Sequence, residues 1–334
     1  MKYKSLILLF IGGCWMHPSF AQELDDYQRC LVETLADADS RMAVGDIREA
    51  CREKHPGMPA ENDQAAASTS AVARRMIQEK ITEDKAFVLT PYRPNYILLA
   101  AYNAAGVNEQ PFQEAFPDKK PDLNDTEVKF QISFKFPIVK NLFGDNGDLY
   151  AAYTNRSFWQ VYNTDSAPFR ETNHEPKAWL RFYNDFEFLG IRNVLNDIGI
   201  VHQSNGRSGS LSRSWNRVYA RFVFESGNLA FAVQPWYRIR ENKKNDDNPD
   251  IEDYLGNFEF QGAYRWGAHE FGLMFRNNLD FDVNRGAAQL DWSFPIHGRL
   301  RGYVQWFNGY GESLIDYNEN VNSFGVGVKL TDWL

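Results

Sequence analysis

The stretch EVKFQISFKF, residues Glu127–Phe136, alternates polar and apolar side chains with a strict period of two. Because successive side chains of a β-strand point to opposite faces, this strand would have one apolar and one polar face. Its length suits a tilted strand that crosses a membrane. A strand of a soluble β-sandwich would alternate in the same way, so this stretch by itself does not distinguish the two folds.

The alternation recurs along the chain, in Lys177–Phe188, Asn257–Trp266 and Ala288–Phe294. We count twelve strand-like segments after residue 86, the last of which, Gly325–Leu334, ends the sequence. Most connections that follow an even-numbered segment are tight turns, such as Pro295–His297, and only 138–147 is longer. Connections that follow odd-numbered segments are long: 102–126, 163–176, 205–215, 241–255, 278–286 and 309–321.

Short turns at one end and long loops at the other are typical of outer-membrane barrels. The fold class we expect is therefore all-β: a twelve-stranded antiparallel transmembrane β-barrel over residues 86–334, preceded by a small N-terminal helical hairpin. The composition agrees with this fold, since mean hydropathy is −0.51 and 24% of residues are charged. No run of ~20 apolar residues follows the N-terminus, which excludes a bundle of membrane helices. The net charge of −8 argues against nucleic acid as a partner.

The N-terminus has the pattern of a secretion signal. Lys2 and Lys4 precede the mostly apolar run Ser5–Trp15, and Ser19–Ala21 matches a small-x-small cleavage site. We expect a signal peptide over residues 1–21. In the alternative, cleavage occurs before Cys14, which would then be acylated as in a lipoprotein.

Residues 22–85 read as a polar, helix-prone extension that ends in a linker at about 55–75, rich in Pro, Ala, Ser, Asn and Asp. Export places the chain in an oxidising compartment, where Cys30 and Cys51 are expected to form a disulfide. We expect this bridge to staple the base of a helical hairpin and to have no catalytic role.

One polar run, His202–Arg217, contains the chemistry of a serine hydrolase. His202 and Ser204 lie two apart and therefore on the same face of a strand. A nucleophilic serine needs a base within hydrogen-bond reach, and the base needs an orienting partner. Asn216 opens the next strand and is expected opposite His202, where it would hold the ring tautomer without adding negative charge. Gly206 either supplies a free backbone N–H to an oxyanion or is present only because glycine allows the backbone to turn.

The alternation places this run on the outer wall. Ile198 and Ile200 share a face with His202 and Ser204, whereas Asp197 points the opposite way. Polar groups on a lipid-facing wall are costly unless they meet each other or a substrate. An enzyme whose substrate is the lipid would place them there, whereas a porin would place them in the lumen. In the alternative interpretation, the spacing of His202 and Ser204 is accidental and the polar loop that follows is simply solvated.

The chain resembles the outer-membrane phospholipase A family over roughly residues 86–334. The motifs that carry the resemblance are the run His202–Arg217 and the segments Ser166–Asn173, Asp246–Asp250 and Gly309–Tyr317. The resemblance implies a twelve-stranded barrel in the Gram-negative outer membrane, with its active site on the outer-leaflet side. It also implies calcium-dependent hydrolysis of the sn-1 and sn-2 acyl esters of phospholipids and lysophospholipids by a homodimer.

Carried over by position, the resemblance makes Ser204 the nucleophile, His202 the base and Asn216 the orienter, with the Gly206 amide helping to hold the oxyanion. For Ca²⁺ it implies oxygen ligands, as a hard cation requires. These are the carbonyl of Arg207, the hydroxyl of Ser212, a contact from Asp247, and Ser166 contributed by the partner subunit. Gly209 departs from the family, which often has an aspartate there, so weaker calcium binding is expected.

Two hypotheses remain open from the residues alone. A phospholipase would release fatty acid in the presence of calcium. A passive porin or adhesion barrel would release none, and would instead show conductance in a planar bilayer. Asn155 and Ser157 have the lipid-facing parity of their strand, and either pair across a dimer interface or lie at headgroup height. The sequence predicts neither the headgroup nor the acyl-chain preference.

Overall fold

The computed structural model describes residues 70–83, 85, 88–118, 122–242, 244, 246–298 and 300–332, together with Cys30, Thr34, Cys51 and Lys54. The chain divides into two compact units, residues 1–67 and 68–334. Within the first unit Cys30 and Cys51 form the expected disulfide, with their Cα atoms 5.8 Å apart. The signal peptide, the helical hairpin and most of the linker lie outside the described residues.

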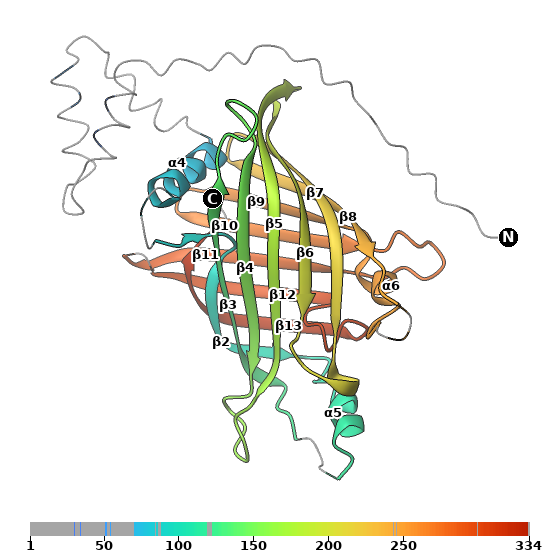
Figure 1. The fold of residues 1–334 in the computed structure, drawn as a ribbon. Helices are drawn as coiled ribbons and strands as arrows, with labels where there is room; N and C mark the ends of the chain where they lie inside the picture. The colour runs from blue at the N-terminus through green and yellow to red at the C-terminus, as the bar shows by residue number, and fades with distance from the viewer. Residues whose placement is uncertain are drawn as a thin grey trace. The chain divides into compact units, whose positions relative to one another are not determined.

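Twelve antiparallel strands, β2–β13, form a closed barrel in which each strand pairs with its neighbours in sequence (Figure 1). The barrel closes where β13 pairs with β2, and a short strand, β1 (Thr90–Pro91), adds to β3. The strands are β2 (Asn95–Asn103), β3 (Thr126–Val139), β4 (Asp148–Trp159), β5 (Phe169–Phe188), β6 (Ile191–Ser204), β7 (Ser214–Ser226), β8 (Leu229–Ile239), β9 (Phe258–Trp266), β10 (His269–Asn277), β11 (Gly286–His297), β12 (Leu300–Tyr310) and β13 (Asn320–Thr331). The predicted twelve-stranded antiparallel barrel is confirmed.

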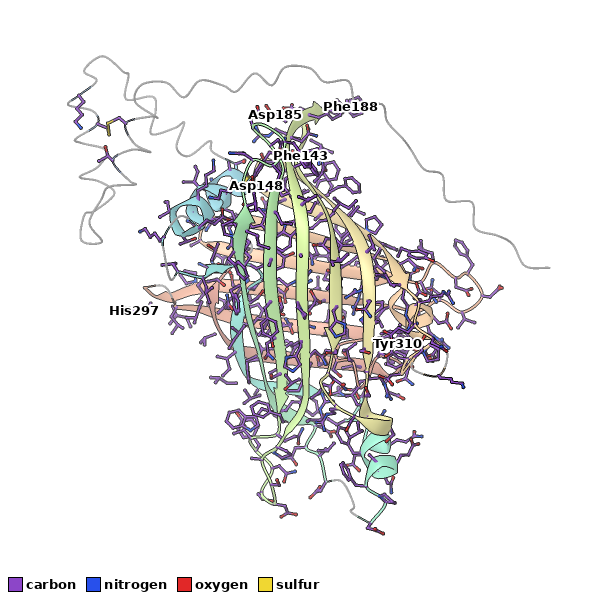
Figure 2. All side chains as sticks on the ribbon, in the orientation of Figure 1. Phe143, Asp148, Asp185, Phe188, His297 and Tyr310 are labelled. Atoms are coloured by element: carbon purple, nitrogen blue, oxygen red, sulfur yellow. A yellow bond between two sulfur atoms is a disulfide. The ribbon has the colours of Figure 1, made fainter. Side chains whose placement is uncertain are left out.

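The connections sort by length as expected. Those after β5, β7, β9 and β11 are two residues long, and the one after β3, 140–147, is longer. The opposite end carries 104–125, 160–168, 205–213, 240–257, 278–285 and 311–319. Two ends can be told apart in Figure 2: Phe188 lies beside the short turn after β5, and Tyr310 ends β12 at the long-loop end.

Two boundaries differ from the sequence-based expectation. The loop expected at 163–176 is shorter, because β5 begins at Phe169. The first residues of β5 have polar side chains on the face towards the lumen. Their low hydropathy therefore gives no sign of a strand in the sequence. The turn expected at Pro295–His297 belongs to β11, whose register shifts between these two residues, and the chain reverses after it.

Paired charges line the inside of the barrel. Ile198 and Ile200 on the outer face are 52% and 58% exposed, whereas Lys129 on the inner face is 1% exposed. The Lys129 ammonium lies 2.7 Å from a carboxylate oxygen of Glu312. Because an unpaired buried charge is strongly destabilising, such pairing allows charged side chains to line the inside of the barrel.

Helix α4 (Ala71–Glu83) packs at the end of the barrel that carries the short turns. Arg75 donates to the carbonyl oxygens of Pro91 and Asp332, at 2.7 and 2.8 Å. Lys135 of β3 lies 2.6 Å from Glu79 of the helix. The sequence predicts a linker and extension before the barrel here, whereas the structure has a helix that contacts β3. None of the described helices is long and apolar enough to cross a membrane.

Candidate active site

Strands β6 and β7 position the histidine and the asparagine. Their register places His202 directly opposite Asn216 and Ser204 opposite Ser214. The Nδ1 atom of His202 lies 2.8 Å from Oδ1 of Asn216. Because an amide oxygen can only accept, Nδ1 carries the ring proton, and Nε2 keeps the lone pair that a general base needs.

The two side chains lie on the outer wall with their apolar neighbours. His202 is exposed, as are Ile200 and Val218 on the same face. The residue between the histidine and the serine, Gln203, points inward, where its Oε1 accepts from Trp215 Nε1 at 2.9 Å and from Arg217 at 3.0 Å. The parity predicted from the sequence therefore holds across the β6–β7 pair.

Ser204 shares the outer face with His202, two residues further along β6. Within the described part of the chain, no hydrogen bond joins the Ser204 hydroxyl to the His202 ring. Residues two apart on a strand have Cα atoms about 6.6 Å apart, so their side chains meet only when both lean together. Catalytic hydrogen bonds commonly tighten when substrate binds, so this spacing is compatible with a nucleophile and its base.

A carboxylate that is not among the sequence-predicted site residues lies next to Asn216. The Asn216 Nδ2 group donates to Oε1 of Glu241 at 3.0 Å. This bond fixes the amide so that its oxygen faces His202. The signal was the register of β7 with β8, which pairs Asn216 with Ile239 and so brings Glu241 to the same neighbourhood. The sequence predicts a loop at 241–255, and a loop residue is not expected to have such a partner.

The loop 205–213, which contains the short 3₁₀ helix η1 (Gly209–Leu211), is held by the buried side chain of Asn205. Its Oδ1 accepts from the backbone N–H groups of Arg207 and Arg213, at 3.3 and 3.0 Å, and its Nδ2 donates to Leu211 O at 2.8 Å. Gly206 has a φ of +65°, a conformation that favours glycine. Among the described residues, no hydrogen bond of the Gly206 amide is recorded, which leaves this N–H available to a ligand.

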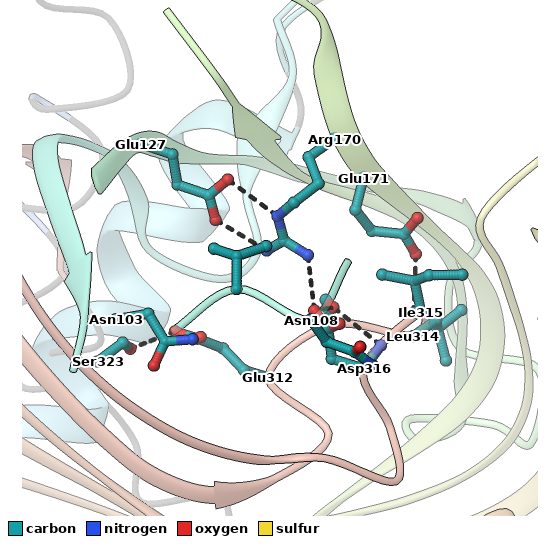
Figure 3. Close-up of polar contacts among 12 residues, drawn as sticks. Asn103, Asn108, Glu127, Arg170, Glu171, Glu312, Leu314, Ile315, Asp316 and Ser323 are labelled. Carbon is teal, nitrogen blue, oxygen red and sulfur yellow. Dashed lines mark hydrogen bonds and ion pairs between the residues drawn. The ribbon is translucent and has the colours of Figure 1, made fainter. Parts of the chain in front are cut away.

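A second loop, 311–319, folds inward and supports the strand beneath the site (Figure 3). Glu171 of β5 is fully buried, and it accepts from the backbone N–H of Ile315 at 3.1 Å and from Asn205 Nδ2 at 3.3 Å. Arg170 pairs with Asp316 at 2.6 Å. The segment Gly309–Tyr317 therefore braces the base of the loop that follows Ser204.

The residues expected to bind calcium are partly brought together. Ser212 Oγ donates to Oδ2 of Asp247 at 2.6 Å, so these two oxygens approach one point. The Arg207 guanidinium turns away to donate to the carbonyl of Arg170 at 2.6 Å. Ser166 is exposed in the loop 160–168, and no contact with the other three residues is recorded among the described residues.

The donor set suits calcium. The expected ligands are a carbonyl, a hydroxyl and a carboxylate, all oxygens that a hard cation prefers. In the part of the chain that the structure describes, no three His, Cys, Asp or Glu side chains gather as a metal site. A site here would therefore combine the single carboxylate of Asp247 with backbone and hydroxyl oxygens.

A model of the phospholipase A1 family matches residues 72–330. Phospholipase A1 of Klebsiella pneumoniae is 40% identical over 274 residues, which cover 81% of this chain and 91% of that protein.

Two solved structures share the fold. The Salmonella typhi outer membrane phospholipase dimer with bound calcium has a TM-score of 0.70 and 38% identity, covering 76% of this chain and 96% of that one. The outer membrane phospholipase A of Escherichia coli, solved with an active-site asparagine replaced by alanine, has a TM-score of 0.69 and 38% identity, covering 75% and 95%.

Proposed function

Because the chain belongs to the phospholipase A1 family, and is thus a phospholipid-hydrolysing enzyme of the Gram-negative outer membrane, we propose that Ser204, His202 and Asn216 form its catalytic triad. The observation that carries this proposal is the 2.8 Å hydrogen bond between His202 and Asn216 on the outer wall, beside Ser204. The active-site asparagine of the E. coli relative supports the role of Asn216.

In the proposed reaction Ser204 Oγ attacks the ester carbonyl carbon of an acyl chain while Nε2 of His202 takes the hydroxyl proton. The carbonyl oxygen becomes an oxyanion, which accepts from the free Gly206 amide. As the carbonyl re-forms, His202 gives its proton to the departing glycerol oxygen, leaving an acyl-enzyme. Water then repeats the sequence, with His202 taking its proton, and releases the fatty acid. Substrates are the sn-1 and sn-2 esters of phospholipids and lysophospholipids.

The position of the triad explains why a membrane lipid can reach it. Ester groups of a phospholipid lie at the boundary between acyl chains and headgroups, and the outer wall of a barrel faces that boundary directly. Ser204 is the last residue of β6, at the long-loop end, where the wall passes from apolar side chains to polar loops. We place this end on the outer-leaflet side.

We further propose that activity requires calcium and a second copy of the chain. Ser212, Asp247 and the Arg207 carbonyl would hold the ion together with Ser166 of the partner subunit. A bound calcium ion supplies positive charge that stabilises the oxyanion. The Ser212–Asp247 contact supports a shared ion, and the Salmonella relative was solved as a dimer with bound calcium.

The test is fatty-acid release from mixed phospholipid–detergent micelles, with calcium or with a chelator. Ser204→Ala and His202→Ala should abolish release, and Ser226→Ala, at the opposite end of the barrel, is the matched control. Heat-dependent mobility in gels reports that each variant has folded. Full activity of Ser204→Ala would refute the triad, and activity that survives the chelator would refute the metal while leaving the triad intact.

A further inference from the structure

A second histidine lies beside the proposed nucleophile. His174 of β5 is paired directly with Ser204 of β6, so both side chains project from the outer wall at the same level. Side chains paired in this way have Cβ atoms about 4.5–5.5 Å apart. His174 is also paired with Asn155 of β4. A polar row therefore runs across three strands, from Asn155 through His174 to Ser204.

The hydrogen bonds of His174 select its tautomer. Its Nδ1 atom lies 2.5 Å from the hydroxyl of Tyr153 and 3.5 Å from Nδ2 of Asn155. Ser157 Oγ donates to Oδ1 of Asn155 at 2.9 Å, which turns the amide nitrogen towards the histidine. An amide nitrogen only donates, and the phenol can donate too, so both groups favour Nδ1 as the acceptor. The ring proton of the neutral imidazole then resides on Nε2.

The opposite side of the ring faces Gly206. A Cβ atom built at Gly206 would lie 3.6 Å from both Nε2 and Cδ2 of His174. Since glycine has no Cβ, the space between this ring edge and the Gly206 backbone is open. The Nε2–H donor and the free Gly206 amide thus border the same space next to Ser204.

We propose that His174 is a catalytic residue, the second hydrogen-bond donor to the oxyanion. This inference rests on the proposed function, in which Ser204 attacks the ester. As the carbonyl oxygen gains negative charge, it accepts from His174 Nε2–H as well as from the Gly206 amide. No proton is transferred: the imidazole stays neutral and the donor is released when the carbonyl re-forms. Tyr153 and Asn155 act as positioning residues, because they hold the tautomer that donates.

The experiment compares His174→Phe with His174→Gln in the full-length enzyme under saturating calcium. Phenylalanine keeps the ring volume without a donor, whereas glutamine offers an amide N–H. Removing one oxyanion donor from a serine protease costs 10²–10³ in kcat; we expect roughly 10- to 100-fold for His174→Phe, with KM within about twofold. His174→Gln should recover part of this loss. His269→Phe, at the opposite end of the barrel, is the matched control and should match the parent.

A long-chain alkyl boronic acid separates catalysis from packing, because its serine adduct mimics the tetrahedral oxyanion. Its inhibition constant for His174→Phe should rise by the factor by which kcat/KM falls. An unchanged kcat, or a lower kcat with unchanged boronate affinity, would overturn the inference. Ser204→Ala is assayed in parallel: if that variant keeps activity, the proposed function itself fails, and if only the His174 variants behave like the parent, the inference alone fails.

Discussion

Replacing Glu241 by glutamine tests whether a charge behind Asn216 assists His202. The substitution keeps a hydrogen-bond acceptor for Asn216 and removes only the negative charge. When His202 takes the serine proton it becomes an imidazolium, which the Glu241 carboxylate attracts through the intervening amide. A neutral glutamine would lose this attraction in the transition state and leave the free enzyme almost unchanged.

The geometry sets the magnitude. Two hydrogen bonds of 3.0 and 2.8 Å and the width of one amide separate the carboxylate from the ring. At about 8 Å, two unit charges interact by about 2 kcal/mol at an effective dielectric constant near 20, and by about 0.5 kcal/mol in water. Glu241 and Asn216 are both partly exposed, so the effect falls between these limits. We therefore expect kcat to fall by roughly 2- to 30-fold.

The assay is fatty-acid release at saturating substrate and calcium, at two ionic strengths. Because the pair is partly exposed, added salt should narrow the difference between Glu241→Gln and the parent enzyme. Glu252→Gln, in the same connection between β8 and β9, is the matched control. Asn216→Ala is assayed in parallel and should have a reduced kcat. If Glu241→Gln then keeps the parental kcat at low salt, the negative charge does not assist His202, and the carboxylate only orients the Asn216 amide.

Three further predictions concern calcium and the helix at the barrel end. Ser212→Ala should raise the calcium concentration for half-maximal activity by about tenfold with little change in kcat at saturation, since one oxygen ligand is lost; an unchanged calcium titration would place the ion elsewhere. Gly209→Asp should lower that calcium concentration, because it adds a carboxylate to the same loop and nothing lies within 4 Å of the added Cβ. The φ of +66° at residue 209 will cost this variant some stability. Isothermal calcium titration measures both variants. Although burial raises it, Lys135 and Arg75 lower the pKa of Glu79 from 4.5 to about 2, so this carboxylate stabilises the fold above pH 4.5 and loses that contribution as the pH falls towards 2. Thermal unfolding measured between pH 6 and pH 2 should show this loss in the parent and less of it in Glu79→Gln.

The residues of single strands were enough to predict the barrel and the shared outer face of His202, Ser204 and Asn216. The alternation in Glu127–Phe136 and the sorting of loop lengths depend only on the period of a strand and on where turns occur. The shared face of His202 and Ser204 follows from the same period. The place of Asn216 could be anticipated because a hairpin returns the chain directly to its neighbour.

Other parts of the candidate site depend on the register between strands and could not be predicted from the sequence. Glu241 reaches Asn216 because of the register of β7 with β8, and His174 reaches Ser204 because of the register of β5 with β6. The inward fold of 311–319 depends on Glu171 and Arg170, which meet that loop only across the closed lumen.

Local sequence therefore determined that this chain is a barrel with a serine and a histidine on its lipid-facing wall, because side-chain direction in a strand has a fixed period. Only the tertiary structure decided which side chains stand beside them. Neighbours across a sheet are chosen by the stagger of paired strands, and a shift of one residue in that pairing would turn His174 away from Ser204.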